Sequence, residues 1–233
     1  MTVLQEIALR QSVFFGGIGL GLVFALIYAV WFCYRGPSWP KTVIKAVPLL
    51  AFAVAAQVNF ANPLIVSALI LSALGDIALS RETQRSFLLG LVAFAAAHVA
   101  YVLHFSGVFY SEDLMRLLNI SPWPALAFIA LALSTERWLI PHTGALRWPV
   151  RGYVVVITLM GLGALSLPPG RELALFGAVA FILSDVLLSV QLFRLGPASR
   201  WRMPSDVLLW LFYVGGQLAI LLGVGFARPL FQI

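Results

Sequence analysis

Two aspartates occur in nearly the same short sequence, and each lies within a long apolar run. Asp76 belongs to Leu-Gly-Asp-Ile-Ala-Leu-Ser at 74–80, and Asp185 belongs to Leu-Ser-Asp-Val-Leu-Leu-Ser at 183–189. A charged side chain at membrane depth costs at least about 2.5–3.5 kcal/mol, so an aspartate in such a place indicates a functional site. The repeated context predicts that both carboxylates serve one shared site.

The composition indicates a membrane protein. Of 233 residues, 61% are hydrophobic and 10% are charged, and the mean hydropathy is +0.98, which excludes an ordinary soluble domain. Apolar segments of roughly 17–25 residues alternate with short polar loops, as in polytopic helical proteins. We therefore expect an all-α fold with eight transmembrane helices in a single integral membrane domain, residues 1–233. The expected helices cover roughly 13–34, 42–58, a segment opening at Asn62-Pro63, 86–105, 123–140, a segment starting near Arg147, 172–191 and 206–226.

The spacing of polar residues favours an internal duplication. The two aspartates lie 109 residues apart (185 − 76), and Lys45 precedes Asp76 by 31 residues while Tyr153 precedes Asp185 by 32. Two parallel four-helix repeats, residues 13–106 and 122–226, would produce this spacing. Chance similarity within so apolar a chain is the alternative.

The positive charge predicts an orientation in the membrane. The net charge is +6, but the Lys and Arg residues stand singly at helix ends, which does not suit nucleic-acid binding. Ten of the fifteen lie in odd-numbered loops and four at the termini or in even-numbered loops, with Lys45 inside a helix. We expect the odd-numbered loops in the cytoplasm and both termini outside, in a bacterial inner membrane. The oligomeric state stays open.

Further polar residues fall at similar depth on the expected helices. His98 and Tyr101 share one helix face, as do Tyr213 and Gln217, because residues three or four apart are neighbours on a helix. With Lys45 and Tyr153, they predict a cavity open to the cytoplasmic leaflet. Structural alternatives are snorkelling of Lys45, an Asp76–Lys45 ion pair, packing of the tyrosines and a simple hydrogen bond from His98.

Together these residues resemble the YhhN-like lysoplasmalogenase family. The resemblance rests on Gly75-Asp76, His98 with Tyr101, Ser184-Asp185, and Tyr213 with Gln217, in this order along eight helices. One departure is that the family often has Lys directly before Pro in its second helix, whereas here Ala46-Val47 separates Lys45 from Pro48.

The resemblance implies hydrolysis of the vinyl-ether bond of lysoplasmalogens, giving a fatty aldehyde and glycerophosphoethanolamine or glycerophosphocholine, without a cofactor or metal. Vinyl-ether hydrolysis needs an acid to protonate a carbon, a base to activate water, and nearby negative charge. Two poorly solvated carboxylates suit this, because one can stay protonated while the other is ionised. Which aspartate is the acid stays open. The expected catalytic residues are Asp76, Asp185, His98, Tyr153 and Tyr213, and the expected substrate-binding residues are Lys45, Tyr101, Ser184 and Gln217.

Two other functions compete with this interpretation. A zinc-dependent intramembrane hydrolase would need about three converging ligands, for which Asp76, His98 and Asp185 are candidates. A proton-coupled carrier would suit two related halves that each bear one buried aspartate. Sensitivity to a chelator would indicate the first, and uptake without lipid cleavage would indicate the second.

Overall fold

The computed structural model describes residues 2–81, 83–107, 122–196 and 198–226, and every regular element in this part of the chain is helical. The all-α prediction is confirmed, and each expected helix has a counterpart among the described residues. The long helices are α1 Val3–Ile27, α2 Trp39–Val58, α3 Pro63–Leu79, α4 Gln84–Phe105, α6 Pro122–Trp138, α7 Arg147–Leu165, α8 Glu172–Phe193 and α9 Arg202–Val224.

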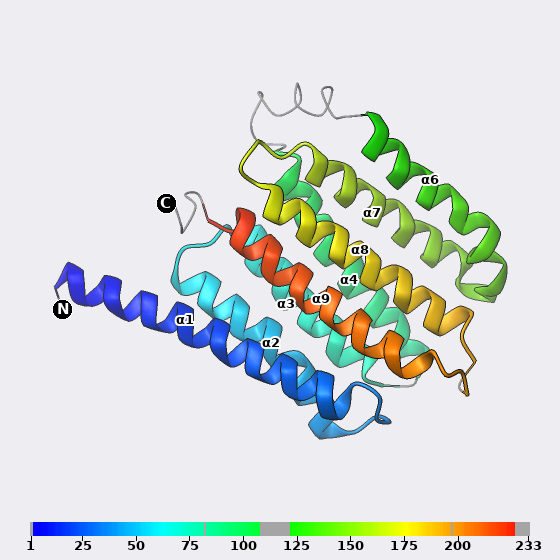
Figure 1. The fold of residues 1–233 in the computed structure, drawn as a ribbon, viewed down its shortest axis with the longest axis horizontal. Coiled ribbons are helices and arrows are strands. Elements are labelled where there is room, and N and C mark those ends of the chain that lie inside the picture. The colour runs from blue at the N-terminus through cyan, green and yellow to red at the C-terminus, as the bar shows by residue number, and fades with distance from the viewer. Residues whose placement is uncertain (1, 82, 108–121, 197, 227–233) are drawn as a thin grey trace.

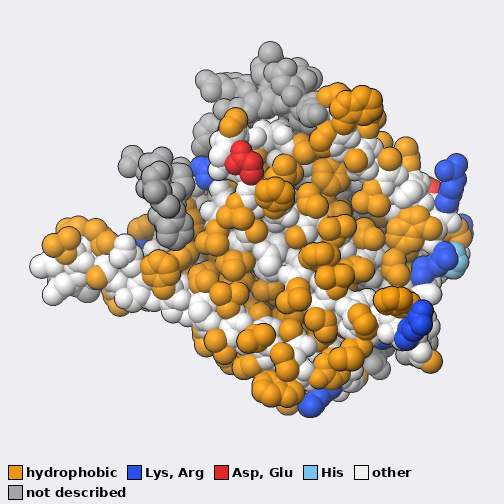
Figure 2. All heavy atoms as spheres, viewed as in Figure 1, with side chains coloured by type: hydrophobic (Ala, Val, Ile, Leu, Met, Phe, Trp, Pro, Cys, Tyr) orange, Lys and Arg blue, Asp and Glu red, His pale blue; other side chains and the backbone are white. Residues whose placement is uncertain are grey.

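The helices have the length and polarity of membrane segments. Six candidate spans in the described residues, at α1, α2, α4, α7, α8 and α9, are long and apolar enough to cross a bilayer. Helix α3 is apolar but has 17 residues, and α6 also has 17. Hydrophobic side chains cover the middle of the visible face, whereas Lys and Arg gather mainly at one end (Figure 2). The chain is an integral membrane protein, and a total of eight spans stays a prediction.

Helices that follow one another in sequence run antiparallel (Figure 1), and the neighbours within α1–α4 and within α6–α9 pack side by side. Contacts between α4 and α7, and between α2 and α9, join the first four helices to the last four. Both ends of the described chain lie at the same end of the bundle (Figure 1). The loops between α1 and α2, α3 and α4, and α8 and α9 therefore lie together at the other end.

The first helix differs from its predicted bounds, because it begins at Val3 instead of near residue 13. Thr2 and Gln5 form a reciprocal capping box, and Arg10 pairs with Glu6 at 2.6 Å, so these polar residues support a helical start. The helix continues through a π-helical turn, Tyr28–Phe32, in which the Cys33 N–H donates to the Tyr28 carbonyl at 2.8 Å. Tyr28 and Cys33 both line a cavity described below.

Glycines bring the aspartate-bearing helices very close to their neighbours. A Cβ atom on Gly177 of α8 would lie 2.7 Å from the Gly216 carbonyl oxygen of α9, and one on Gly216 would lie 2.7 Å from the Gly177 carbonyl. Next to Asp76, a Cβ on Gly75 would lie 2.6 Å from the Phe94 ring of α4. Small residues allow such close backbone approach in membrane helices. The packing therefore holds Asp76 and Asp185 at well-defined positions.

Candidate active site

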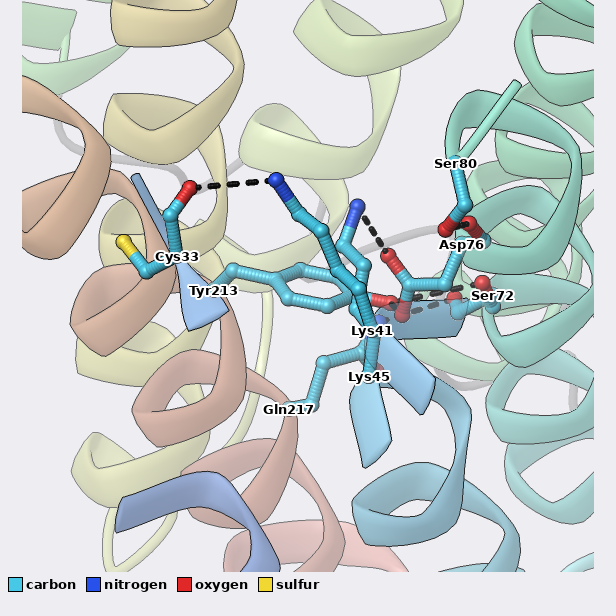
Figure 3. Close-up of polar contacts among 8 residues, drawn as sticks. All are labelled: Cys33, Lys41, Lys45, Ser72, Asp76, Ser80, Tyr213 and Gln217. Atoms are coloured by element: carbon cyan, nitrogen blue, oxygen red, sulfur yellow. Dashed lines mark hydrogen bonds and ion pairs between the residues drawn. The ribbon is translucent and has the colours of Figure 1, made fainter. Parts of the chain in front are cut away.

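Asp76 is the centre of a first polar cluster formed by α2, α3 and α9. Its carboxylate is buried, with Oδ1 3.0 Å from Lys45 Nζ and Oδ2 accepting a hydrogen bond of 2.7 Å from the Tyr213 hydroxyl. Figure 3 shows both side chains pointing at the carboxylate. The ion pair that the sequence left as an alternative is thus present. Both oxygens of Asp76 have a partner, so this carboxylate is well satisfied.

A short hydrogen-bonded chain extends the first cluster toward α4. Gln217 donates through Nε2 to the Ser72 hydroxyl at 2.8 Å, and Tyr101 donates to the Gln217 amide oxygen. All three side chains are fully buried. The bonds connect α3, α4 and α9, and Gln217 lies one turn beyond Tyr213 on the same face of α9, as the spacing predicted.

Asp185 is the centre of a second cluster, formed by α4, α7 and α8. Its Oδ2 lies 3.2 Å from His98 Nε2, and neither atom has a hydrogen-bond partner although both are buried. The Tyr153 side chain of α7 lies beside the carboxylate and in edge contact with the His98 ring, their centroids 5.4 Å apart. Buried unpaired polar atoms are rare in proteins, and a catalytic role is one explanation for them.

The hydrogen bond of the other ring nitrogen of His98, Nδ1, bears on where a proton can lie in the contact between Nε2 and Asp185. Nδ1 lies 2.7 Å from the Phe94 carbonyl oxygen, which only accepts, so Nδ1 carries a proton. A bare Nε2 facing an ionised carboxylate oxygen would bring two acceptors together. One proton between the two atoms would therefore satisfy both of them.

Aromatic rings separate the two clusters. The Phe181 ring lies 4.4 Å from the His98 ring and 5.5 Å from the Tyr213 ring, centroid to centroid. Asp76 and Asp185 have no direct partner in common. The two aspartates thus have separate direct partners, in two neighbouring clusters. That both carboxylates serve one site stays a prediction.

The partners of the two aspartates come from corresponding helices. Asp76 on α3 meets Lys45 on α2 and Tyr213 on α9, whereas Asp185 on α8 meets Tyr153 on α7 and His98 on α4. Suppose that α1–α4 correspond to α6–α9. Each aspartate then contacts one residue on the helix before its own, α2 or α7. Its second partner lies on the last helix of the opposite half, α9 or α4. This is the pattern that a duplication would produce, and the two repeats remain a prediction.

A cavity of about 610 Å³ opens at the end of the bundle that carries the odd-numbered loops. Its wall includes five basic side chains, Arg35, Lys41, Lys45, Arg81 and Arg202, together with Asp206. Burial raises the pKa of the Cys33 thiol in this wall to about 12, so the thiol is protonated near neutral pH. A basic cavity with Lys45 in its wall can accept an anionic group such as a phosphate.

One predicted residue lies outside both clusters, and others were missed. Ser184 donates to the Phe181 carbonyl of its own helix at 2.7 Å, and its role in substrate binding stays a prediction. Ser72 was not predicted, although it lies one turn before Asp76 on the same face of α3. The sequence indicated Asp206 only as the start of a helix. Nothing in the sequence indicates that this residue lies in the wall of the cavity.

Within the residues that the structure describes, no three His, Cys, Asp or Glu side chains converge closely enough to hold one metal ion. The set proposed for zinc, Asp76, His98 and Asp185, is divided between the two clusters. His98 also has its Nδ1 engaged by a backbone carbonyl. These residues therefore do not fit a tetrahedral zinc site.

Comparison with known proteins identifies the family. A model of the YhhN family matches residues 40–224, which is most of the chain. The chain belongs to the YhhN family. The match covers α2 to α9 and thus every residue of both clusters.

Several curated proteins are similar to this YhhN chain. Lysoplasmalogenase TMEM86B of Homo sapiens is 30% identical over 174 residues, 71% of each chain. Lysoplasmalogenase TMEM86A of Homo sapiens is 29% identical over 223 residues, which are 87% of this chain and 85% of that protein. A lysoplasmalogenase of Mycobacterium bovis is 30% identical over 189 residues, 78% of this chain and 68% of that protein. No solved structure matches the chain.

Proposed function

We propose that this protein hydrolyses the vinyl-ether bond of lysoplasmalogens, releasing a fatty aldehyde and glycerophosphoethanolamine or glycerophosphocholine. Relatives named lysoplasmalogenase, at about 30% identity over most of the chain, support this substrate class. The bilayer-spanning helices give a single-chain lipid direct access from the membrane. The basic cavity offers charged groups for its phosphate.

The observation that carries the proposal is the buried Asp185–His98 pair, whose facing atoms need one proton to satisfy them. Cleavage of a vinyl ether begins with protonation of the carbon that is β to the ether oxygen. A proton held by a buried pair beside the scissile bond is well placed for this step, because it need not be drawn from bulk solvent. We assign the proton donor to this pair.

The reaction then balances as follows. The proton of the pair forms a C–H bond at the β-carbon, using the electrons of the double bond, and leaves an oxocarbenium ion stabilised by the Asp185 carboxylate. Water adds to the cationic carbon while the pair takes back a proton from it, so the pair acts first as acid and then as base. The resulting hemiacetal loses its hydroxyl proton to the leaving oxygen and separates into aldehyde and alcohol. One water is consumed.

The first cluster has a supporting role in this scheme. Asp76 is neutralised by Lys45, and Lys45 is also in the wall of the basic cavity, to which we assign the phosphate. Tyr213 connects Asp76 to the aromatic layer next to His98. We assign Tyr101 and Gln217 to holding α4 and α9 at the spacing that the two clusters require.

The test is fatty-aldehyde release from a lysoplasmalogen in detergent by the wild type, Asp185→Asn, His98→Ala and Asp76→Asn. Glu136→Gln, which removes an exposed carboxylate outside both clusters, is the matched control. We expect the wild type and the control to be active. Asp185→Asn and His98→Ala should each lower the rate of aldehyde release at least about a hundredfold, and Asp76→Asn should retain more activity than either.

The outcomes separate the functions. Release that a strong chelator abolishes would indicate a metal-dependent hydrolase and overturn the proton-donating pair. Equal loss in both aspartate variants, with folding retained, would favour one aspartate as acid and the other as base. No release by the wild type, with uptake of a solute into sealed vesicles, would replace the hydrolase by the carrier.

A further inference from the structure

Three cavities follow one another through the protein. The basic cavity and a second cavity of about 30 Å³ have four wall residues in common, Leu79, Phe87, Leu188 and Leu192. The second cavity shares another four, Val150, Tyr153, Asp185 and Ser189, with a third cavity of about 50 Å³ between α6, α7 and α8. Asp185 therefore lies where the second and third cavities meet.

The walls change from polar to apolar along this row. The first cavity has five basic side chains in its wall. The third is lined mainly by apolar groups such as Phe128, Leu131 and Ile157. The hydroxyls of Thr135 and Thr158 in its wall are bonded to carbonyls of their own helices, so these residues present mostly methyl groups. The row has the polarity of a lipid with one charged end and one hydrocarbon chain.

We propose that the third cavity, which we call the chain slot, binds the hydrocarbon chain of the substrate between α6, α7 and α8. The inference rests on the proposed function and adds where the chain lies. A lipid with its phosphate in the basic cavity and its chain in the chain slot must pass Asp185. The bond between its polar and apolar parts then comes to the carboxylate and imidazole atoms that lack partners.

The chain slot must widen to take a full chain, because its volume of about 50 Å³ holds only a few water-sized groups. Its outer wall is α6, and Thr135 is the one buried residue of this helix, all of whose residues the structure describes. A helix with so little buried surface can move outward at small cost. The opposite wall, formed by α7 and α8, carries Tyr153 and Asp185.

The test is the dependence of cleavage on chain length. Ala132→Phe places a ring in the chain slot, and Leu133→Phe, the control, places the same ring on the adjacent residue, whose side chain is 68% exposed. Aldehyde release is measured from lysoplasmalogens with an eighteen-carbon and an eight-carbon chain. We expect Ala132→Phe to reduce the rate of aldehyde release from the long-chain substrate about tenfold, which is the effect of displacing about two methylenes. The rate with the short-chain substrate should change little.

Ile157→Ala provides a second measurement that adds space instead of removing it. We expect it to increase cleavage of a lysoplasmalogen whose chain ends in a bulky pyrene group. The chain slot is overturned if a folded Ala132→Phe variant reduces cleavage of both substrates equally, or reduces cleavage of neither. It is also overturned if Ile157→Ala does not increase cleavage of the pyrene substrate. Absence of cleavage by the wild type on every chain would instead contradict the proposed function.

Discussion

At the scale of single residues, the two aspartates differ in how completely their charge is compensated. Asp76 has a lysine and a tyrosine on its two oxygens, whereas Asp185 Oδ2 and the histidine nitrogen that faces it both lack a hydrogen-bond partner. Pairing with a cation stabilises the ionised form of a buried carboxylate. The same residue type in the same sequence context is therefore fully paired in one half, and in the other it has a buried oxygen without a hydrogen-bond partner.

Removing one member of the Asp76–Lys45 pair tests the fixed charge. Lys45→Met leaves a buried carboxylate without its cation, so we expect the free energy of unfolding to fall by about 3–5 kcal/mol. Adding Asp76→Asn removes the unpaired charge and should restore much of that loss. Thermal unfolding in detergent measures both.

The surface pair Arg151–Glu136, 2.7 Å apart and partly exposed, is the control. Arg151→Met should leave the unfolding temperature nearly unchanged, because exposed pairs contribute little. If Lys45→Met also left the unfolding temperature unchanged, the 3.0 Å contact between Lys45 and Asp76 would not contribute to stability.

At the scale of helices, close packing around glycine positions both carboxylates. Gly216 of α9 faces Gly177 of α8, eight residues before Asp185. No side chain fits between these two backbones. Residues far from the clusters thereby determine how the aspartate-bearing helices lie.

Gly216→Ala tests this packing, and Gly215→Ala is a control on the same helix with nothing within 4 Å of the added carbon. The alanine at 216 would lie 2.7 Å from a backbone oxygen, so α8 and α9 must separate, which we expect to cost about 1–3 kcal/mol. Gly215→Ala should be neutral or slightly stabilising. The readout is thermal unfolding, and equal behaviour of both variants would contradict close α8–α9 contact.

Helical periodicity in the sequence was sufficient to find most of the polar residues but not their pairing. The three-residue step from His98 to Tyr101, and the four-residue step from Tyr213 to Gln217, predicted shared faces, which the structure confirms. Whether α4 meets α8 or α3 meets α9 depends on how helices are arranged across the bundle, and a local pattern carries no such information. The start of α1 was missed because Gln5, Glu6 and Arg10 interrupt the apolar run while satisfying one another and the helix end.

At the scale of the whole molecule, charge and architecture divide the bundle into two ends. The odd-numbered loops lie together at the end that holds the basic cavity, and the ends of the described chain lie at the other (Figure 1). The excess of Lys and Arg in those loops predicts that the basic cavity faces the cytoplasm.

Single cysteines in a Cys33→Ala background test this orientation. We expect Gly36→Cys, between α1 and α2, to react with a membrane-impermeant thiol reagent only from the cytoplasmic side of sealed vesicles. Pro169→Cys, between α7 and α8, should react only from the opposite side. Both positions are exposed loop residues. The reverse pattern would invert the orientation, and labelling of both from one side would contradict the antiparallel α1–α9 arrangement.

The change from polar to apolar walls along the row of cavities has a consequence for what leaves the protein. Under the proposed function, cleavage at Asp185 would divide an amphiphile into a water-soluble headgroup and an oily aldehyde, and each fragment would occupy the cavity whose polarity matches its own. The headgroup would then depart into the aqueous phase at the basic end, and the aldehyde sideways past α6 into the lipid. Two products with separate exits would not recombine readily at the site, so their partition between water and membrane would drive turnover forward.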